Sequence, residues 1–330
     1  MAFLLVRNGV RKPIYENASP GQPSCMYSTR PLTKEAALAW FNETLRQNRD
    51  TTLPPHVFKF MSPASPHFEE NMRNAIVGSS LYLTPREYFN DPFDTAVACE
   101  MGSEAEQREH LREMSIRSGD DLNDDPEAFE YMASTYYQEG CFERDTQSNL
   151  ARIGICSFTA EVENLLMWAY YAESHKGVAL IFQMHNAQAH LDALPVRYQE
   201  EFSRITPSIR AIDEMLLYGP LHKGADWRHE REWRIVRPLE AGKQFPFDWS
   251  LLWGVIHGLR CEQATKTLVA KLCIERMKLG RPPIHFYDAR AVAGAYGLEF
   301  YEDIPVKRPK PINFKEPLPV PPKIIRTPIP

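Results

Sequence analysis

The pattern of apolar and polar residues changes between helical and strand periods along the middle of the chain. Apolar side chains recur at helical spacing in Leu165–Ser174, which predicts a helix with Trp168 on its apolar face. Val178–Phe182 is apolar at every position, as is typical of a strand buried on both faces, and Arg152–Thr159 is a further predicted strand. We therefore expect an α+β fold, with a central mixed sheet flanked by helices.

The same two periods predict the remaining elements. Strands are expected at His56–Met61, Ser80–Thr84, Arg231–Val236, Trp253–Leu259, Ile284–Phe286 and Leu298–Tyr301, and helices at Thr33–Gln47, Pro66–Val77, Pro207–Leu217 and Glu262–Met277. Two more predicted helices, Ser103–Met114 and Pro126–Tyr137, form a helical insertion at about residues 100–150. Basic residues and Gly177 after Leu165–Ser174 predict a helix end with a left-handed glycine.

Three parts follow from this order of elements. Residues 1–50 form a predicted N-terminal arm and helix, and residues 51–303 a single α+β domain that contains the insertion. Prolines recur among basic residues in 304–330, which predicts an extended, poorly packed tail that could bind a protein partner.

Composition narrows the class of protein. Among 330 residues, 38 Lys and Arg stand against 43 Asp and Glu, a net charge of -5, so there is no global basic excess of the kind that marks nucleic-acid binding proteins. The six cysteines form no paired motif and no His-Glu-x-x-His occurs, so no metal is expected, and Cys156 is interpreted as a core residue. No apolar run is long enough to span a bilayer, and a cytoplasmic location without membrane contact is expected.

The densest chemistry lies in Trp227–Val236, where charged groups and two indoles share ten positions. Interpreted as a strand, this segment places Glu230, Glu232 and Arg234 on one face, because side chains alternate with period two. The alternative is a solvated ladder of ion pairs.

Other candidate residues have equally ordinary alternatives. Ser157 and Thr159 could face one ligand from a rigid strand, or satisfy nearby backbone groups. Trp168 and Tyr171 could stack on a planar ring, or belong to the core. Lys59 is a cation between two aromatic neighbours, or a solvated strand residue.

The segment Phe89–Asp94 is a turn that contains Asn90 and Asp91 as candidate ligand contacts. Its alternative is a well-capped helix start. Taken together, the carboxylates, hydroxyls, aromatic faces and cation suit the cleavage of an N-glycosidic bond. Such a reaction builds positive charge on a ribose, and a fixed carboxylate lowers its barrier.

These segments resemble a known family. Ser80–Asp94, Cys156–Thr159 with Leu166–Ala172 and His175–Gly177, and Trp227 with Glu230–Arg234 are similar to the bacterial family catalogued as domain of unknown function 2971. The resemblance spans roughly Val57 to Val236. It implies relatives without implying a reaction.

A looser resemblance is to ADP-ribosyltransferases, which use NAD and carry a basic residue, a Ser-Thr-Ser-like element and a Glu-x-Glu pair in that order. It implies Glu232 as the catalytic carboxylate and Glu230 as the group that orients the acceptor. Lys59, Ser157, Thr159 and an aromatic residue such as Tyr171 would bind NAD, with Asn90, Asp91, Trp168 and Arg234 as further candidate contacts. Lysine replaces the usual arginine or histidine, and Phe158 interrupts the hydroxyl run.

We therefore expect an NAD-using transferase or glycohydrolase acting on a macromolecular or nucleotide acceptor, in the role of a toxin or phage-defence effector. One alternative is a non-enzymatic binding or regulatory module. Another is a metal-dependent nuclease that uses Asp91, Asp94 and Glu232.

Overall fold

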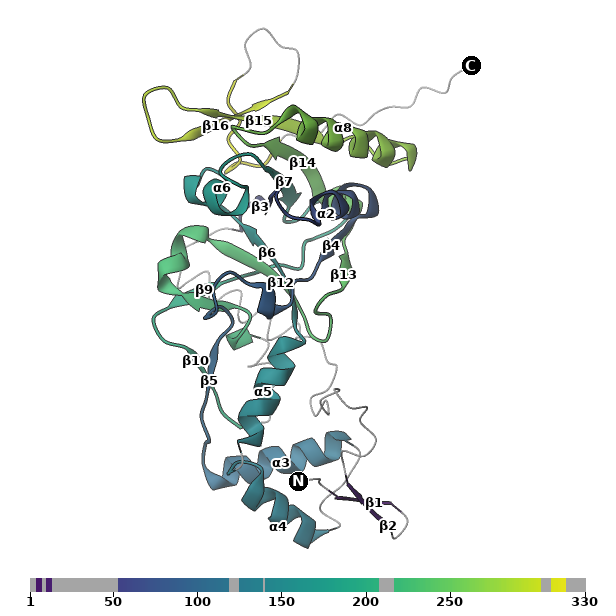
Figure 1. Ribbon diagram of the computed structural model, residues 1–330, viewed down its shortest axis with the longest axis vertical. Coiled ribbons are helices and arrows are strands. Elements are labelled where there is room, and N and C mark those ends of the chain that lie inside the picture. The colour runs from purple at the N-terminus through teal and green to yellow at the C-terminus, as the bar shows by residue number, and fades with distance from the viewer. Residues whose placement is uncertain are drawn as a thin grey trace. The chain divides into compact units, whose positions relative to one another are not determined.

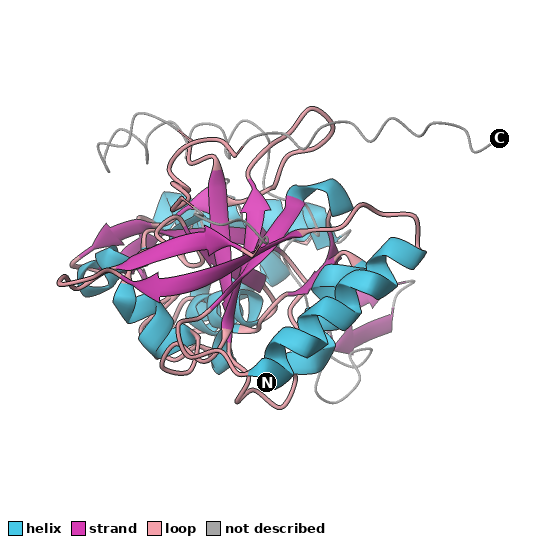
Figure 2. Cartoon of the chain, turned by 90° about the horizontal axis from the view of Figure 1, so that it is seen from above, coloured by secondary structure: helices cyan, strands magenta, loops and turns pink. Residues whose placement is uncertain are grey.

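The computed structural model describes residues 4–7, 10–13, 53–118, 125–138, 140–207, 217–303 and 310–318. Helices and strands both contribute to this part of the chain, and an eight-stranded mixed sheet is its largest element (Figures 1 and 2). The predicted α+β class is confirmed. The chain divides into two compact units, Met1–Thr51 with Tyr82–Ser157 and Ala193–Phe245, and Thr52–Leu81 with Phe158–Asp192 and Pro246–Pro330. They are called unit 1 and unit 2 below.

The helices of unit 1 lie in the predicted insertion. They are α3 (Glu104–Ser118), α4 (Pro126–Thr135) and α5 (Cys141–Ala151). The first two were predicted and the third was not. The sequence fixes the start of α4, because the Asp125 side chain accepts a hydrogen bond from the Ala128 amide and Pro126 occupies the first turn. Buried side chains including Leu111, Tyr136 and Phe142 form the core of these helices.

The strands of unit 1 are short. They are β1 (Leu4–Arg7), β2 (Val10–Pro13), β5 (Val97–Cys99), β8 (Leu194–Pro195), β9 (Arg197–Gln199), β10 (Ser203–Ile205), β11 (His222–Gly224) and β12 (Glu232–Arg237), with single turns η2 (Arg86–Tyr88) and η4 (Ala225–Glu230). β12 lies between β8 and β6 (Gly154–Thr159), whose first four residues belong to this unit. Cys156 of β6 is fully buried, as predicted.

Unit 2 carries most of the large sheet. Its order is β16 (Leu298–Glu302), β15 (His285–Ala291), β14 (Leu252–His257), β7 (Val178–Gln183), β3 (His56–Met61) and the last two residues of β6 (Figure 1). β14 is parallel to β15 and antiparallel to β7, so the sheet is mixed. Five predicted strands, including the fully apolar β7, are thereby confirmed. Short β4 (Ser80–Tyr82) and β13 (Gln244–Pro246) complete the described strands.

The helices of unit 2 are α2 (Phe68–Arg73), α6 (Leu165–Tyr171) and α8 (Gln263–Lys278). α2 continues directly into the π-helical turn η1 (Asn74–Gly78), and η5 (Trp249–Leu251) is a single 3-10 turn. The end of α6 differs from the prediction. The left-handed residues are Glu173, Ser174 and His175, with φ of 47°, 52° and 70°, rather than Gly177. Gly177 is needed for space, since a Cβ there would lie 2.2 Å from the Met61 carbonyl oxygen.

Part of the proline-rich tail is packed. Within 310–318, Phe314 is buried and its ring meets the edges of Phe58, Tyr287 and Phe300 at centroid distances of 5.5, 5.2 and 5.6 Å. The Ile312 amide donates to the Phe300 carbonyl at 2.8 Å. The prediction of a poorly packed tail is therefore wrong for these residues, because Phe314 supplies an apolar anchor.

Two predicted helices concern residues that the structure does not describe. The helix expected at Thr33–Gln47 and nearly all of that expected at Pro207–Leu217 lie outside the described residues. The domain boundaries stay a prediction. None of the helices in the described ranges is long and apolar enough to cross a membrane.

Candidate functional site

The segment Trp227–Val236 is not one strand. Its first part is the turn η4, which ends at Glu230, and Arg231 then adopts a left-handed conformation with φ of 43° before β12 begins at Glu232. Strand alternation therefore applies only from Glu232 onward, where Glu232 and Arg234 share a face. Glu230 reaches the same place through the turn. The predicted grouping of the three side chains is correct, and the predicted strand geometry for Glu230 is wrong.

Arg234 is the centre of a buried charge cluster formed by Asp94, Lys223, Glu230, Glu232 and Arg234. Its Nε and Nη2 donate to the two oxygens of Glu232 at 2.8 Å each, and its Nη1 and Nη2 donate to those of Asp94 at 2.8 and 2.6 Å. Nη1 also donates to the Pro220 carbonyl at 2.7 Å. All five guanidinium N–H groups are thus used, which a lysine could not reproduce.

Lys223 supplies the second cation. Its ammonium lies 2.5 Å from Glu230, 3.2 Å from Glu232 and 3.4 Å from the Asp94 carboxylate. It also lies 4.8 Å from the centroid of the Trp227 ring. Burial acts to lower the pKa of Lys223, but the surrounding carboxylates, led by Glu232, raise it above its ordinary value. Lys223 therefore stays charged at physiological pH.

Glu232 is ionised for the same reason. Burial acts to raise its pKa, but the charges of Arg234 and Lys223 and the hydrogen bonds from Arg234 and Ser157 lower it to about 2. An ionised carboxylate only accepts hydrogen bonds, so the Ser157 hydroxyl is the donor in that contact. Ser157 of β6 is half-buried, whereas Glu232 exposes 6% of its surface. The amide of Glu232 donates to the Tyr198 hydroxyl at 2.7 Å.

Charges within the cluster are nearly balanced. Three carboxylates face two cations, and the half-buried Arg86 interacts electrostatically with Asp94 from nearby. A buried cluster of this kind costs desolvation energy that its internal contacts repay, and losing one member leaves a charge without its partner. The cluster holds Glu232 and Arg234 in single orientations.

The other predicted residues of unit 1 lie in the turn before β5. Asp91 accepts a hydrogen bond from the Phe93 amide at 2.9 Å, as a turn-forming side chain does. Asn90 is exposed. The chain forms turns here instead of a capped helix, and the aspartate that reaches the charge cluster is Asp94.

Four predicted contacts belong to unit 2. Trp168 is fully buried, donates from Nε1 to the Val162 carbonyl at 2.7 Å and stacks on His175, so it is a core residue that no ligand can stack on. Thr159 is buried and its hydroxyl accepts from the Glu161 amide at 2.9 Å. Lys59 is half-buried, with its ammonium 5.8 Å from the Phe158 ring centroid. Tyr171, at the end of α6, is half-buried.

A metal-dependent nuclease would need carboxylates gathered around a cation. Asp94 and Glu232 instead bind the same guanidinium. Across the described ranges, no group of three or more His, Cys, Asp or Glu residues could hold a metal ion. The arrangement of Asp94 and Glu232 gives the nuclease alternative no support.

Lys223 and Tyr198 were not found from the sequence. Neither lies in a motif, and the burial that gives Lys223 its importance is a tertiary property. Charge balance gives a signal, because two carboxylates that become buried require cations close by. Asp94 was considered only as a metal ligand, and its partner is Arg234.

The comparisons with known proteins reach only part of this region. No curated protein and no solved structure matches the chain. Residues 167–235, which include Lys223, Glu230, Glu232 and Arg234, match the family model described as "Protein of unknown function (DUF2971)". The earlier segments that carry Asp94 and Ser157 lie outside the matched residues. Over residues 167–235 the chain is therefore similar to that family, whose description assigns no activity.

Proposed function

We propose that the chain cleaves the N-glycosidic bond between nicotinamide and ribose in NAD, as a transferase or glycohydrolase. The proposed site includes Ser157 and Glu232. The observation that carries the proposal is the hydrogen bond between the Ser157 hydroxyl and the ionised carboxylate of Glu232. It joins a strand hydroxyl to a carboxylate that stays negative at physiological pH. A ribose that becomes positively charged in the transition state is stabilised by such a pair.

The cluster supports this role by holding Glu232 rigidly. Both carboxylate oxygens accept from Arg234, and Lys223 lies 3.2 Å away. A preorganised charge needs no reorientation when the transition state forms. The proposal gives Glu232 an electrostatic role, because a group with a pKa of about 2 is a poor proton donor at neutral pH.

Burial limits which atoms touch the substrate. Glu232 exposes 6% of its surface and Glu230 2%, whereas Ser157 is half-buried. The proposal therefore places Ser157 against the nicotinamide ribose and Glu232 behind it. Glu230, which is 2.5 Å from Lys223, holds that lysine in place instead of orienting the acceptor.

The test is nicotinamide release from NAD by the purified full-length protein, with and without bacterial lysate as a source of acceptor. Ser157→Ala removes the hydroxyl and keeps the charge cluster. It is expected to lower kcat by about 100-fold, the loss typical of one well-placed polar group in an active site. Ser134→Ala is the matched control, because that exposed hydroxyl donates only to the Tyr131 carbonyl within α4.

Glu232→Gln gives a second measurement, read together with its melting temperature. Activity lost in a folded Glu232→Gln protein supports the proposal. No nicotinamide release by the unmodified protein with any lysate, or full activity in Ser157→Ala, contradicts it. If NAD is consumed, lowered NAD in expressing bacteria is the expected sign of a toxin or phage-defence role.

A binding or regulatory module is the second candidate, favoured by an exposed aromatic pair in unit 1. Phe93 and Phe202 expose 67% and 48% of their surfaces and stack with ring centroids 6.2 Å apart. Exposed aromatic residues are enriched at protein interfaces. Phe93→Ser with Phe202→Ser should then abolish recovery of a partner while nicotinamide release, if present, is unchanged.

The tail can be tested separately. Because Phe314 and Leu318 are buried, a truncation must begin after them. Deleting residues 319–330 leaves both anchors in place. Loss of partner recovery on this deletion assigns the tail a docking role, and unchanged recovery removes that role.

A further inference from the structure

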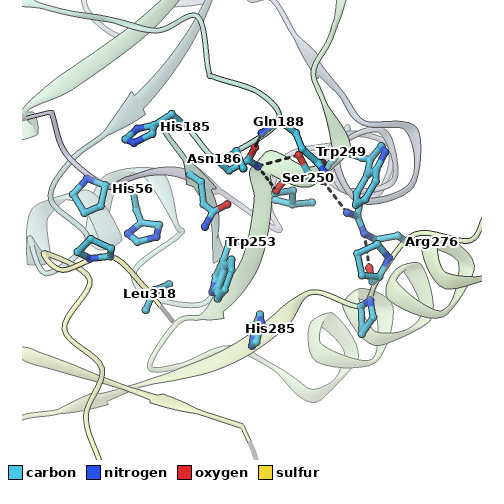
Figure 3. Close-up of a pocket in the computed structure, with 17 residues that line it drawn as sticks. His56, His185, Asn186, Gln188, Trp249, Ser250, Trp253, Arg276, His285 and Leu318 are labelled. Carbon is cyan, nitrogen blue, oxygen red and sulfur yellow. Dashed lines mark hydrogen bonds between the residues drawn. The ribbon is translucent and has the colours of Figure 1, made fainter. Parts of the chain in front are cut away.

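A pocket of about 700 Å³ lies within unit 2 (Figure 3). Its walls come from the start of β3, the end of β7 with the loop after it, the η5–β14 junction, the segment after α8 and residues 317–318 of the tail. The lining is mostly apolar, with prolines and two tryptophans. This volume is in the range that holds a small organic ligand.

Two polar side chains enter the pocket from neighbouring strands. His56 of β3 and Gln183 of β7 are direct cross-strand partners in the antiparallel register, and both line the pocket. Direct partners project on the same side of a sheet with their Cβ atoms about 4.5–5.5 Å apart. Imidazole and carboxamide therefore form one polar edge on rigid strands.

The hydrogen-bonding state of this edge is defined. The Nδ1 atom of His56 lies 3.4 Å from the Phe314 carbonyl, which can only accept, so Nδ1 carries the proton and Nε2 is an acceptor. Burial lowers the pKa of His56, which keeps the ring neutral. Gln183 is half-buried, and its carboxamide makes no hydrogen bond to any residue in the described ranges. It offers one acceptor and a donor group side by side.

Trp253 supplies a ring face beside this edge. His285 covers one face of the indole, with centroids 4.5 Å apart and planes 6° from parallel. In Figure 3, Trp253 is drawn between His285 and His56, and Trp253, His56 and Gln183 all line the pocket. The indole Nε1 donates to the Tyr287 hydroxyl at 3.0 Å, which fixes the plane of the ring.

The pocket disfavours a cationic ligand. Among the described residues that line it there is no carboxylate, and Arg276 is the one with a permanent charge. That guanidinium already donates to the carbonyls of Ile76, Trp249 and Pro282 at 3.0, 2.8 and 3.0 Å. Three of its five N–H groups are thus used by the backbone, which leaves it less able to bind a phosphate and favours an uncharged ligand.

We propose that this pocket binds the adenine base of an adenosine-type ligand, between the Trp253 face and the His56–Gln183 edge. The exocyclic amino group of adenine donates one hydrogen to the Gln183 carbonyl and the other to His56 Nε2. The Gln183 amide donates to the adjacent ring nitrogen, the bidentate pairing that carboxamides make with adenine. The inference is independent of the proposed NAD chemistry, because adenosine has no nicotinamide and therefore lacks the nicotinamide–ribose bond that this chemistry would cleave.

The test is calorimetric titration of the full-length protein with adenosine and with inosine, which differ by one exocyclic group. Inosine carries a carbonyl oxygen where adenosine carries the amino group. A flipped Gln183 amide could still pair with inosine, but His56 Nε2 would then face an oxygen lone pair. Adenosine is expected to bind at least about tenfold more tightly, since unpaired buried acceptors weaken binding.

Gln183→Met removes the amide while keeping its length, and should weaken adenosine binding by about 5- to 150-fold, the usual range for a bidentate base contact. Gln263→Met is the matched control, because that glutamine is exposed on α8 outside the pocket. Trp253→Phe should retain binding that Trp253→Leu loses. Melting temperatures of all variants separate loss of binding from loss of fold.

The expected pattern is adenosine binding that Gln183→Met weakens and Gln263→Met leaves unchanged. Three results would overturn the proposal: no heat with adenosine at millimolar concentration, equal affinity for inosine, or full affinity in a folded Gln183→Met protein. Nicotinamide release in the absence of adenosine binding would leave the NAD proposal standing and remove this one.

Discussion

Arg234 and Asp94 form a bidentate ion pair between residues 140 positions apart in the chain, with N–O distances of 2.8 and 2.6 Å. Their side chains are 1% and 2% exposed, so water contributes almost nothing to the pair. The pair fixes the turn that contains Asp94 against β12. It also holds Arg234 in the plane that lets it reach Glu232.

Asp94→Asn should strongly destabilise the protein, because it leaves the Arg234 charge buried with one carboxylate fewer. The expected loss is about 3–5 kcal/mol in the free energy of unfolding, measured by urea denaturation. Asp91→Asn, in the same turn, keeps the acceptor for the Phe93 amide and should change stability by less than about 0.5 kcal/mol. Similar losses in the two variants would contradict a special role for the pair.

Lowering the pH should reduce the free energy of unfolding, because Glu232 becomes protonated. Its pKa falls from 4.5 to about 2 in the folded protein, so its contribution is complete above pH 4.5 and is lost as pH drops toward 2. The full difference corresponds to about 3 kcal/mol. In urea titrations, Glu232→Gln should show a shallower fall in stability over this window. Glu201→Gln changes an exposed carboxylate and should follow the unmodified protein.

Gly258→Ala should damage the contact between the loop after β14 and the turn after α6. A Cβ at this position would lie 2.3 Å from the His175 carbonyl oxygen, which real structures do not tolerate. The expected loss is at least about 1–3 kcal/mol, seen as a lower melting temperature. Gly224→Ala is the control, since its nearest neighbour would be 3.8 Å away and its φ is negative. Equal melting temperatures for the two variants would contradict a close approach of Gly258 to the His175 carbonyl.

Phe314→Ala should reveal the anchoring of the tail. Its ring is buried among Phe58, Tyr287 and Phe300, so truncation should cost about 3–5 kcal/mol in the unfolding free energy. Lys315→Ala removes an exposed ion pair with Glu163 and should cost less than about 1 kcal/mol. A Phe314→Ala protein as stable as Lys315→Ala would mean that the tail does not support the core.

Periodicity predicted the long elements well, because burial on one or both faces leaves a clear trace in the sequence. Val178–Phe182 and Glu262–Met277 are examples, found as β7 and α8. The break at Arg231 left no such trace. A left-handed arginine is set by the surrounding tertiary contacts, and the strand pattern continued through it.

The charge cluster was predictable in part. Glu230, Glu232 and Arg234 stand out because they are close in sequence, whereas Asp94, Ser157 and Lys223 join them only through folding. For Trp168 the sequence instead predicted a ligand contact that the structure does not allow. It was a candidate for ligand stacking because sequence shows an aromatic ring but not whether that ring is covered.

One further consequence concerns Arg276, whose single guanidinium binds carbonyls near residues 76, 249 and 282. Displacement of this one side chain would break all three contacts at once, although the Arg281 guanidinium would still bind the Val77 carbonyl beside the first segment. Loss of the Arg276 guanidinium should accordingly loosen that wall of the pocket at three places together.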